Sequence, residues 1–289
     1  MQKIVPHLWF DTQAVEAAHH YVATFPGSAI LGQSVLSETP SGTVDLVQLS
    51  LAGYEFQFLS AGPQFTINPS VSFLVNCTSA AEVDALHAGL SPGGLEMMAL
   101  GSYPFSPRYA WVKDRFGVSW QLMFREGPAP TQKIVPVQMF TGSNAGKAEA
   151  ALGFYTSLFG GSVDFVSRYG PGMSPNGAEM VNHGAFTLAG ERFVAMDSAL
   201  DHGYTFNEAV SYIAYADDQA EVDRLWAALS ADPGAEACGW LRDRYGFSWQ
   251  IVPRELASLM QGEAGPRVAQ AFLKMKKLDL VELRRVAGR

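Results

Sequence analysis

The sequence predicts an α+β fold of two tandem copies of one domain, each holding two strand-helix-strand-strand-strand modules, followed by a helical tail. The first sign is repetition, because residues 114–121 (DRFGVSWQ) return as 243–250 (DRYGFSWQ). The repeat is about 130 residues long, which is enough to close a hydrophobic core, whereas solenoid repeats have periods of roughly 20–50 residues. The second sign is that helical and strand-like patterns alternate in the same order in both copies. The third is a purely helical pattern after Pro253.

The first module of each repeat opens with a strand at the shared Lys-Ile-Val-Pro motif and continues into an amphipathic helix. Asp11 is expected to be the N-cap of the first of these helices. The apolar positions recur at near-helical spacing in both copies; they are Ala14, Ala18, Tyr21 and Phe25, matched by Ala148, Leu152, Tyr155 and Phe159. Three strands are expected after each helix, over 29–35, 43–51 and 54–60, and over 162–168, 180–188 and 191–196.

The second module of each repeat begins with a strand, over 70–76 or 210–216, and continues into a capped helix. Ser79 with Glu82, and Asp218 with Glu221, have the spacing of a capping box. Three strands are again expected to follow, the last over 119–124 or 248–252. The chain then contains four modules, at 1–61, 69–125, 132–197 and 208–254.

These modules define a first domain at 1–127, a second at 131–254 and a helical tail at 255–289, with a short proline-containing segment between the domains. The tail has apolar positions at helical spacing, and Asp279 is its predicted N-cap. It also carries basic residues, namely Lys274, Lys276, Lys277, Arg284, Arg285 and Arg289. A helix with an apolar stripe is nevertheless more typical of docking onto the rest of the chain than of binding a membrane or a nucleic acid.

Composition narrows the classes of function. The 289 residues are 48% hydrophobic and 17% charged, which is typical of a globular protein with a sizeable core. The net charge of −8 argues against a nucleic-acid partner, because phosphate binding needs clustered Lys and Arg. No apolar run is long enough to span a membrane and no secretory pattern opens the chain, so we expect a cytoplasmic protein without a membrane partner.

Four segments resemble one known family: 3–11 (KIVPHLWFD), the helix end at 21–26, 68–77 (NPSVSFLVNC) and 240–253 (WLRDRYGFSWQIVP). They are similar to the PhnB-like family of the vicinal oxygen chelate superfamily, the relatives of glyoxalase, bleomycin-resistance proteins and dioxygenases. The likeness spans both repeats and reaches the tail. It implies that pairs of the predicted βαβββ modules curl into an incomplete β-barrel that forms a cup.

Members of this family are often labelled 3-demethylubiquinone methyltransferases. The sequence lacks a Gly-x-Gly-x-Gly turn after an opening strand, the feature that would hold a nucleotide-like cofactor. We therefore expect no S-adenosylmethionine.

The resemblance also implies a divalent metal such as zinc, nickel, iron or manganese, held in the cup by His, Glu and Gln from several strands. Gln121 and Gln250 stand where metal-dependent relatives often have Glu, and a neutral amide is a poorer ligand than a carboxylate. His7 lies near a first-strand ligand position. Its counterpart in repeat two is Val137, and Gln138 is one place out of register.

A second set of metal candidates lies in repeat two. His183 sits in a strand pattern that resembles the metal-bearing strand of some relatives, and Glu191 follows on the next strand. The candidate metal ligands are therefore His7, His183 and Glu191, and either no metal or one divalent ion is expected.

A ligand in the cups would contact side chains that point away from the core. Strand alternation favours core positions for Trp120 and Trp249, so that the glutamine after each would face the cup. Trp9 shares a strand face with the first-strand histidine and can line a pocket. The candidate ligand-binding residues are His7, Trp9, Gln57, Gln121, Gln138 and Gln250.

Three functions stay open on this basis. The first is a small-molecule-binding protein without catalysis, with a ligand cup in each repeat and degenerate metal positions. The alternative is a metal-dependent lyase, isomerase or dioxygenase of the glyoxalase type with one active cup, and the third is a structural role. Because the tandem supplies what two single-domain chains would supply by dimerising, we expect a monomer with an internal pseudo-dimer. The sequence leaves open whether modules pair within a repeat or between repeats.

Overall fold

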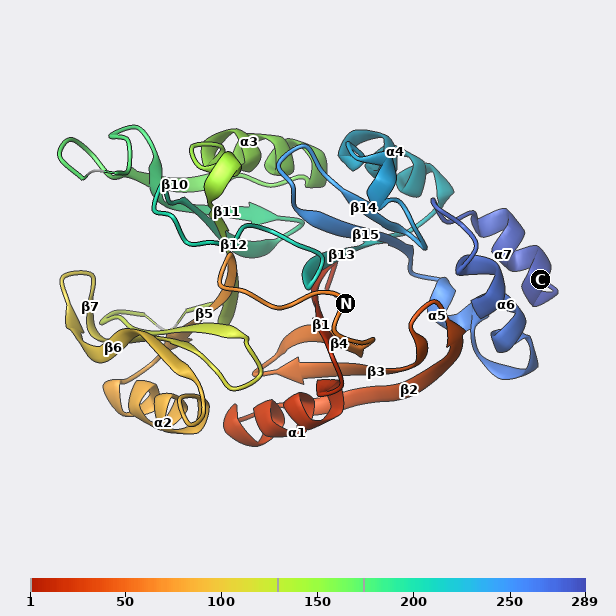
Figure 1. Cartoon of the computed structure of the whole chain (residues 1–289), viewed down its shortest axis with the longest axis horizontal. Helices are drawn as coiled ribbons and strands as arrows, with labels where there is room; N and C mark the ends of the chain where they lie inside the picture. The colour runs from red at the N-terminus through yellow and green to blue at the C-terminus, as the bar shows by residue number, and fades with distance from the viewer. Residues whose placement is uncertain (1, 129, 174) are drawn as a thin grey trace.

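The computed structural model describes residues 2–128, 130–173 and 175–289, so Ala129 of the segment between the predicted domains lies outside the described residues. Two β-sheets are flanked by helices (Figure 1). The strands are β1 (Ile4–Phe10), β2 (Ala29–Thr39), β3 (Gly42–Leu51), β4 (Tyr54–Ser60), β5 (Val71–Cys77), β6 (Leu95–Tyr103), β7 (Ser106–Lys113), β8 (Ser119–Phe124), β9 (Ile134–Phe140), β10 (Val163–Arg168), β11 (Val181–Leu188), β12 (Glu191–Asp197), β13 (Val210–Ala216), β14 (Trp240–Arg242) and β15 (Ser248–Pro253). The helices are α1 (Ala14–Thr24), α2 (Ala80–Leu90), α3 (Ala148–Phe159), α4 (Gln219–Leu229), α5 (Leu256–Leu259), α6 (Gly265–Phe272) and α7 (Leu280–Ala287).

Each sheet combines one module from each repeat. Sheet A has the strand order β14-β15-β13-β1-β4-β3-β2, and sheet B has the order β10-β11-β12-β9-β5-β8-β7-β6. The modules meet at antiparallel pairs, β1 with β13 in sheet A and β5 with β9 in sheet B. The predicted α+β class and tandem halves are confirmed, and the modules pair between repeats rather than within them.

The two sheets pack back to back, so each has an inner face in a shared core and an outer face that points away from it (Figure 1). Phe56 on β4 meets Phe73 on β5 with ring centroids 5.0 Å apart. Phe193 on β12 meets Tyr212 on β13 with centroids 5.6 Å apart. Because side chains alternate along a strand, the residues between these core positions face outward.

A buried carboxylate fixes each first-module helix to the last strand of the module that follows it. Asp114 accepts a hydrogen bond from the Tyr21 hydroxyl at 2.6 Å and from Trp120 Nε1 at 2.8 Å, and two backbone N–H groups of its own turn complete the set. Asp243 accepts from Tyr155 in the same way at 2.6 Å. Both tryptophans of this motif are fully buried on inner faces, as predicted.

The N-terminus of α1 differs from the prediction. Asp11 is not the N-cap, because Gln13 occupies that position and makes no side-chain capping bond. The hydroxyl of Ser60, at the end of β4, accepts from the Ala14 N–H at 3.0 Å instead. Asp197, at the end of β12, supplies the equivalent acceptor for α3. The free N–H groups of these helices are thus satisfied by a strand distant in sequence rather than by a local cap.

Both predicted capping boxes of the second modules are confirmed, because each capping side chain accepts from the N–H of the glutamate three residues later; the pairs are Ser79 with Glu82 and Asp218 with Glu221. The same glutamates link modules of different repeats. Lys3 Nζ lies 2.7 Å from Glu221, and Lys133 pairs with Glu82. These half-buried ion pairs lie at the two places where the repeats exchange modules.

The fourth module has one strand fewer than predicted. Three strands were expected after α4, but only β14 and β15 form. The stretch from the end of the helix to the Asp-Arg turn is about ten residues shorter than in the second module, which removes the length of a strand and its turn. Sheet A is therefore seven-stranded and sheet B eight-stranded.

The tail docks beside sheet A, on the side of the molecule opposite sheet B (Figure 1). Its core packs against Val252 on β15 and consists of Leu256, Leu259, Val268, Leu278, Leu280 and Leu283. Asp279 caps α7 as predicted, accepting from two backbone N–H groups. Within the described ranges, no helix has the length and hydropathy that crossing a membrane requires.

Candidate ligand-binding sites

A row of polar side chains crosses the outer face of sheet A. His7 on β1 is paired in register with Ser211 on β13 and with Gln57 on β4. The row continues to Ser248 on β15 and to Gln48 on β3. Residues opposite one another on neighbouring strands place their side chains on the same face, close enough to interact. Five polar side chains from both repeats therefore lie along one line.

His7 is the most enclosed ring of this row. It is 2% exposed and meets the half-buried Trp240 edge-on, with ring centroids 5.2 Å apart. Trp9, two residues further along the same face of β1, also meets Trp240, with centroids 6.5 Å apart. Burial lowers the pKa of His7 to about 3, so the imidazole is neutral at physiological pH. No described group hydrogen-bonds its Nδ1.

Ser248 contributes a second unpaired atom to the same row. Its Oγ is buried and has no hydrogen-bond partner in the part of the chain that the structure describes. The neighbouring Ser211 hydroxyl, in contrast, accepts from Gln250 Nε2 at 3.0 Å. A buried polar atom without a partner costs about 1–3 kcal/mol, so such atoms need a physical reason.

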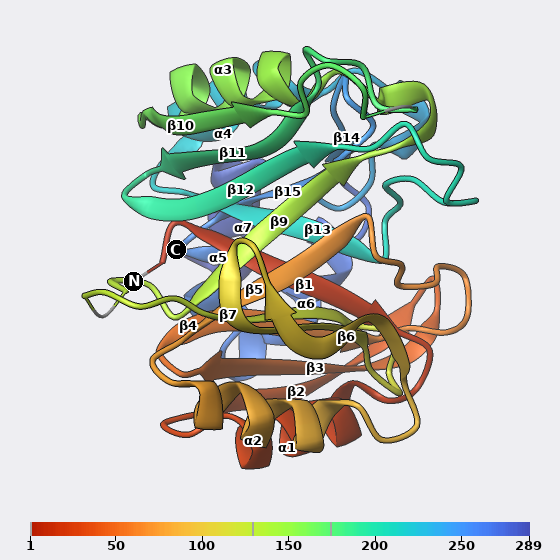
Figure 2. The ribbon, with the colours of Figure 1, turned by 90° about the vertical axis from the view of Figure 1, so that its left-hand side faces the viewer.

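The equivalent row on sheet B is apolar. Ser72 keeps the serine, but Val137, Val194 and Ala185 follow it in the same register. The outward apolar cluster of this sheet consists of Leu74, Tyr109, Met123, Val135, Val137 and Val194, with Met98, Tyr103, Trp111 and Met196 packed against it. Figure 2 looks onto this face, where β10, β11, β12 and β9 follow one another. The two outer faces have therefore diverged after the duplication.

The polar groups on the outer face of sheet B satisfy one another. Gln121 Nε2 donates to the Ser72 hydroxyl at 2.8 Å, and the Tyr109 hydroxyl donates to Gln121 Oε1 at 2.8 Å. Both ends of the amide are thus engaged. Gln121 supports the floor of this face rather than offering a free group to a ligand.

The remaining candidates of the sequence do not come together. Gln138 is buried on the inner face of sheet B, away from the other ligand candidates. His183 is half-buried on the outer face of the same sheet. Glu191 pairs in register with Leu188, whose side chain is in the shared core, and accepts from the Lys3 N–H at 2.8 Å. His183 and Glu191 therefore point to opposite sides of the sheet.

The structure thus brings together four of the predicted ligand residues on sheet A, namely His7, Trp9, Gln57 and Gln250. Sequence reasoning missed Ser211 and Ser248, which lie in the same row, and Trp240, whose ring contacts His7. A signal was present, because the serines before the two repeated tryptophans, Ser119 and Ser248, recur in the duplicated motif.

The donor atoms on sheet A do not fit the divalent metal that the resemblance implies. His7 offers one neutral nitrogen as a metal ligand, and the side-chain amides of Gln57 and Gln250 are weak metal ligands. Divalent ions of this kind favour several imidazole or carboxylate ligands that converge from different strands. In the ranges 2–128, 130–173 and 175–289, no group of three or more His, Cys, Asp or Glu side chains could hold an ion.

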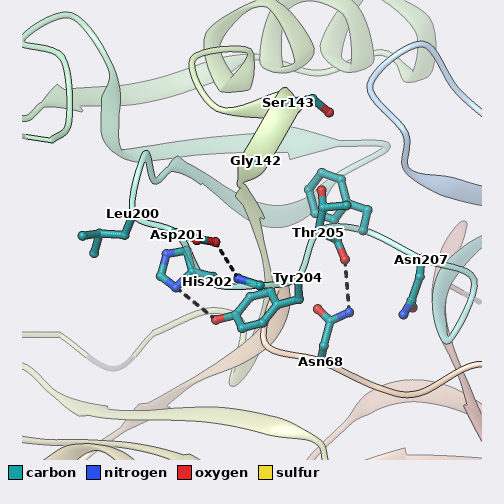
Figure 3. A pocket seen from close by; sticks show the side chains of 11 residues that line it. Asn68, Gly142, Ser143, Leu200, Asp201, His202, Tyr204, Thr205 and Asn207 are labelled. Atoms are coloured by element: carbon teal, nitrogen blue, oxygen red, sulfur yellow. Dashed lines mark hydrogen bonds between the residues drawn. The ribbon is translucent and has the colours of Figure 1, made fainter.

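A cavity of about 520 Å³ lies away from both outer faces, among the loops around His202 (Figure 3). The His202 ring stacks on Tyr204, with centroids 5.2 Å apart, and its Nε2 shares a hydrogen bond of 2.7 Å with Ser198 Oγ. Partial burial lowers the pKa of His202. The carboxylate of Asp201, the residue before His202, accepts a hydrogen bond from the Gly203 N–H of the same loop. A Ser-His-Asp triad would need that carboxylate on the imidazole.

Two hydrogen bonds join the repeats beside this cavity. Asn68 Nδ2 donates to the Thr205 carbonyl at 3.1 Å, and Asn207 Nδ2 donates to the Thr66 carbonyl at 2.9 Å. The two bonds are reciprocal, because each asparagine precedes the first strand of a second module. Asn68 and Asn207, which line the cavity, are therefore accounted for by the contact between the repeats.

A family model described as 3-demethylubiquinone-9 3-methyltransferase matches residues 2–123 and residues 132–252. The chain belongs to this family. It carries the family's PhnB-like domain twice, which agrees with the duplication seen in the sequence. The PhnB protein from Bacillus cereus is 34% identical to this chain and is matched over 100% of its own length and 43% of this chain, with a TM-score of 0.40.

Larger matches extend over both repeats. Glyoxalase I from Zea mays covers 86% of this chain and 93% of its own, with 12% identity and a TM-score of 0.54. A variant of the same maize protein gives a TM-score of 0.57 at the same coverage and identity. At this identity the likeness shows the fold alone, which is that of the vicinal oxygen chelate superfamily. Among curated proteins, none matches this chain.

Proposed function

We propose that this PhnB-like protein binds small molecules on the outer faces of its two sheets and catalyses no reaction there. Sheet A supplies a polar site centred on His7, and sheet B supplies an apolar site. The observation that carries the proposal is the pair of buried, unpaired atoms, His7 Nδ1 and Ser248 Oγ, in one row. A ligand that bonds to both would offset about 1–3 kcal/mol for each atom.

The surroundings of His7 favour a small ligand with a neutral polar group. Trp9 and Trp240 provide flat apolar walls, and Trp9 is held in place by its own bond from Nε1 to the Gly62 carbonyl at 2.7 Å. Small-molecule sites commonly combine such walls with a few placed polar atoms. A neutral imidazole can donate at one nitrogen and accept at the other, which suits an amide, alcohol or carbonyl.

A metal-dependent lyase, isomerase or dioxygenase is the alternative function, and the donor chemistry described above disfavours it. We likewise propose no methyl transfer from S-adenosylmethionine, because the sequence has no glycine turn for such a cofactor. We further propose that the protein is a cytoplasmic monomer that acts without nucleic acid or membrane. The exchange of modules inside one chain supports the monomer, since each sheet is complete without a second copy.

A thermal-shift screen of polar metabolites tests the proposal. A ligand at 100 times its Kd adds about 2.7 kcal/mol to stability, which raises Tm by about 4–5 °C for a chain of this size. The wild type should respond to at least one compound class. His7→Phe should not respond, because it keeps an aromatic ring beside Trp240 but removes both nitrogens. His19→Phe, at an exposed position of α1, is the matched control and should respond like the wild type.

Two results would count against this function. One is that no compound stabilises the wild type, or that compounds stabilise His7→Phe equally well. The other is stoichiometric zinc, nickel, iron or manganese in the purified protein after metal supplementation, which would favour the metal-dependent alternative.

A further inference from the structure

The outer face of sheet B carries basic side chains in a chain whose net charge is −8. The basic side chains at its regular outward positions are Lys113, His183 and Arg192, and Arg125 continues the outward register just after β8. Asp164, at the bulge of edge strand β10, accepts from the Ser162 hydroxyl. The other acidic strand residues are paired with inward-facing positions or bond to inner groups; they are Glu96, Glu191 and Asp197. The face thus has a positive bias that the whole chain lacks.

Arg125 and His183 come from different repeats but share one environment. Burial, and after it the positive charge of Arg125, lowers the pKa of His183. The Phe165 ring, with its centroid 6.4 Å from that of His183, borders the same region.

An aromatic cavity adjoins Arg125. It has a volume of about 490 Å³ and is lined by the β6–β7 hairpin, Arg125 and Glu126. Tyr103 and Phe105 stack there with centroids 5.6 Å apart, and Tyr109 meets Phe105 edge-on at 5.0 Å. Phe105 is 48% exposed, so its ring is available to a bound molecule. A guanidinium beside accessible aromatic rings can bind an anionic group while the rings contact an apolar body.

We infer that the outer face of sheet B and this adjoining cavity bind a planar, apolar molecule with one anionic group, of the aromatic carboxylate or sulfonate class. Arg125 pairs with the anionic group, and Phe105 contacts the ring. The outer face of sheet B favours an apolar ring system in the ligand, because both ends of the Gln121 amide are already hydrogen-bonded within the protein and offer no free polar group. This inference rests on the proposed function and names the ligand class of one of its two sites.

Two dyes of nearly the same shape test the inference on the full chain. N-phenyl-1-naphthylamine is neutral, and 8-anilino-1-naphthalenesulfonate adds one sulfonate; both gain fluorescence in an apolar site. We expect the anionic dye to bind the native protein about tenfold more tightly than the neutral dye. Arg125→Gln should abolish that preference and leave the neutral dye unaffected. Glu126→Gln should strengthen binding of the anionic dye.

Arg192→Gln is the matched control, because it removes a basic side chain from the same face outside the cavity. It should leave the preference for the anionic dye within about twofold of the wild-type value, since one distant exposed charge is screened. Circular dichroism and the urea midpoint should confirm that each variant is folded. The inference fails if the neutral dye binds and the anionic dye binds no more tightly. It also fails if Arg192→Gln reduces the preference for the anionic dye as much as Arg125→Gln does. In both cases the proposed function stands. If neither dye binds the native wild type, the apolar site of the proposed function fails as well.

Discussion

His7 of the first repeat packs edge-on against Trp240 of the second, with ring planes at 89° and centroids 5.2 Å apart. The contact exists because β1 pairs with β13 rather than with a strand of its own repeat. The same exchange places Ser211 and Ser248 of repeat two in the row of His7. This row of polar side chains is therefore a property of the tandem chain and not of either repeat.

The neutrality of His7 leads to a pH prediction. Its pKa is about 3 in the folded protein and 6.5 ordinarily, so the unfolded chain takes up a proton below pH 6.5 that the folded chain refuses. Stability is therefore lost as pH falls from 6.5 toward 3. Relative to His7→Gln, the wild type should lose about 2 kcal/mol in free energy of unfolding between pH 7 and pH 5. Urea titrations at several pH values measure this, and parallel curves for the two proteins would show that His7 titrates normally.

Glu191 should give a pH dependence of opposite sign. Burial raises its pKa to about 7, although the Lys3 N–H and the Tyr54 hydroxyl bond to the carboxylate. The folded protein then holds a proton that the unfolded chain releases near pH 4.5, so stability falls as pH rises from 4.5 to 7. Glu191→Gln should match the wild type near pH 4 and exceed it by about 1–3 kcal/mol at pH 8. The idea fails if the stability difference between the two proteins is the same at both pH values.

The buried carboxylates under α1 and α3 should be strong determinants of stability. In Asp114→Asn an amide N–H₂ would face the Tyr21 hydroxyl and Trp120 Nε1, which both donate to the native carboxylate. We expect a loss of about 2–4 kcal/mol in free energy of unfolding. Asp84→Asn, which breaks only a partly exposed pair with Arg108, should cost less than about 1 kcal/mol. Equal losses in urea denaturation would mean that the buried hydrogen bonds contribute little.

Module exchange predicts the behaviour of one repeat alone. A protein of residues 1–127 would lose the partners of both β1 and β5, which lie in the other repeat. Two unpaired strand edges favour association with a second copy, in which β1 can pair with β5 of the partner. Light scattering should show a dimer of the first repeat at micromolar concentration and a monomer of the full chain. A folded, stable monomer of the first repeat would speak against exchange as the basis of the fold.

The duplicated pattern was sufficient to predict the first three modules but not the partners with which they pair. Alternation along the last strands correctly placed Trp120 and Trp249 in the core, because that signal is local. The choice between β5 and β13 as the neighbour of β1 is not local, since both strands carry the same pattern. The lost strand of the fourth module was also missed, although the shorter spacing between Leu229 and Asp243 contained that information.

A candidate residue could be predicted where its own side chain suggested a role. It could not be predicted where the role depends on which strands pair and in which register. His7 was identified from the family resemblance and its place on the first strand, and Gln57 from its place on the fourth strand. Ser248 was not identified, because it joins His7 only through the strand pairing between repeats: His7 on β1 lies opposite Ser211 on β13, and Ser211 lies opposite Ser248 on β15. The sequence suggested that His183 and Glu191 could bind the same metal ion. The turn between β11 and β12 instead places their side chains on opposite faces of the sheet.

The most direct test is a crystal structure of the full chain with a compound that the thermal-shift screen identifies. We expect density for that compound against Trp240, with its polar atoms within hydrogen-bond distance of His7 Nδ1 and Ser248 Oγ. Ordered water at both atoms with the compound bound elsewhere would contradict it, and so would an anomalous signal from a metal ion at His7.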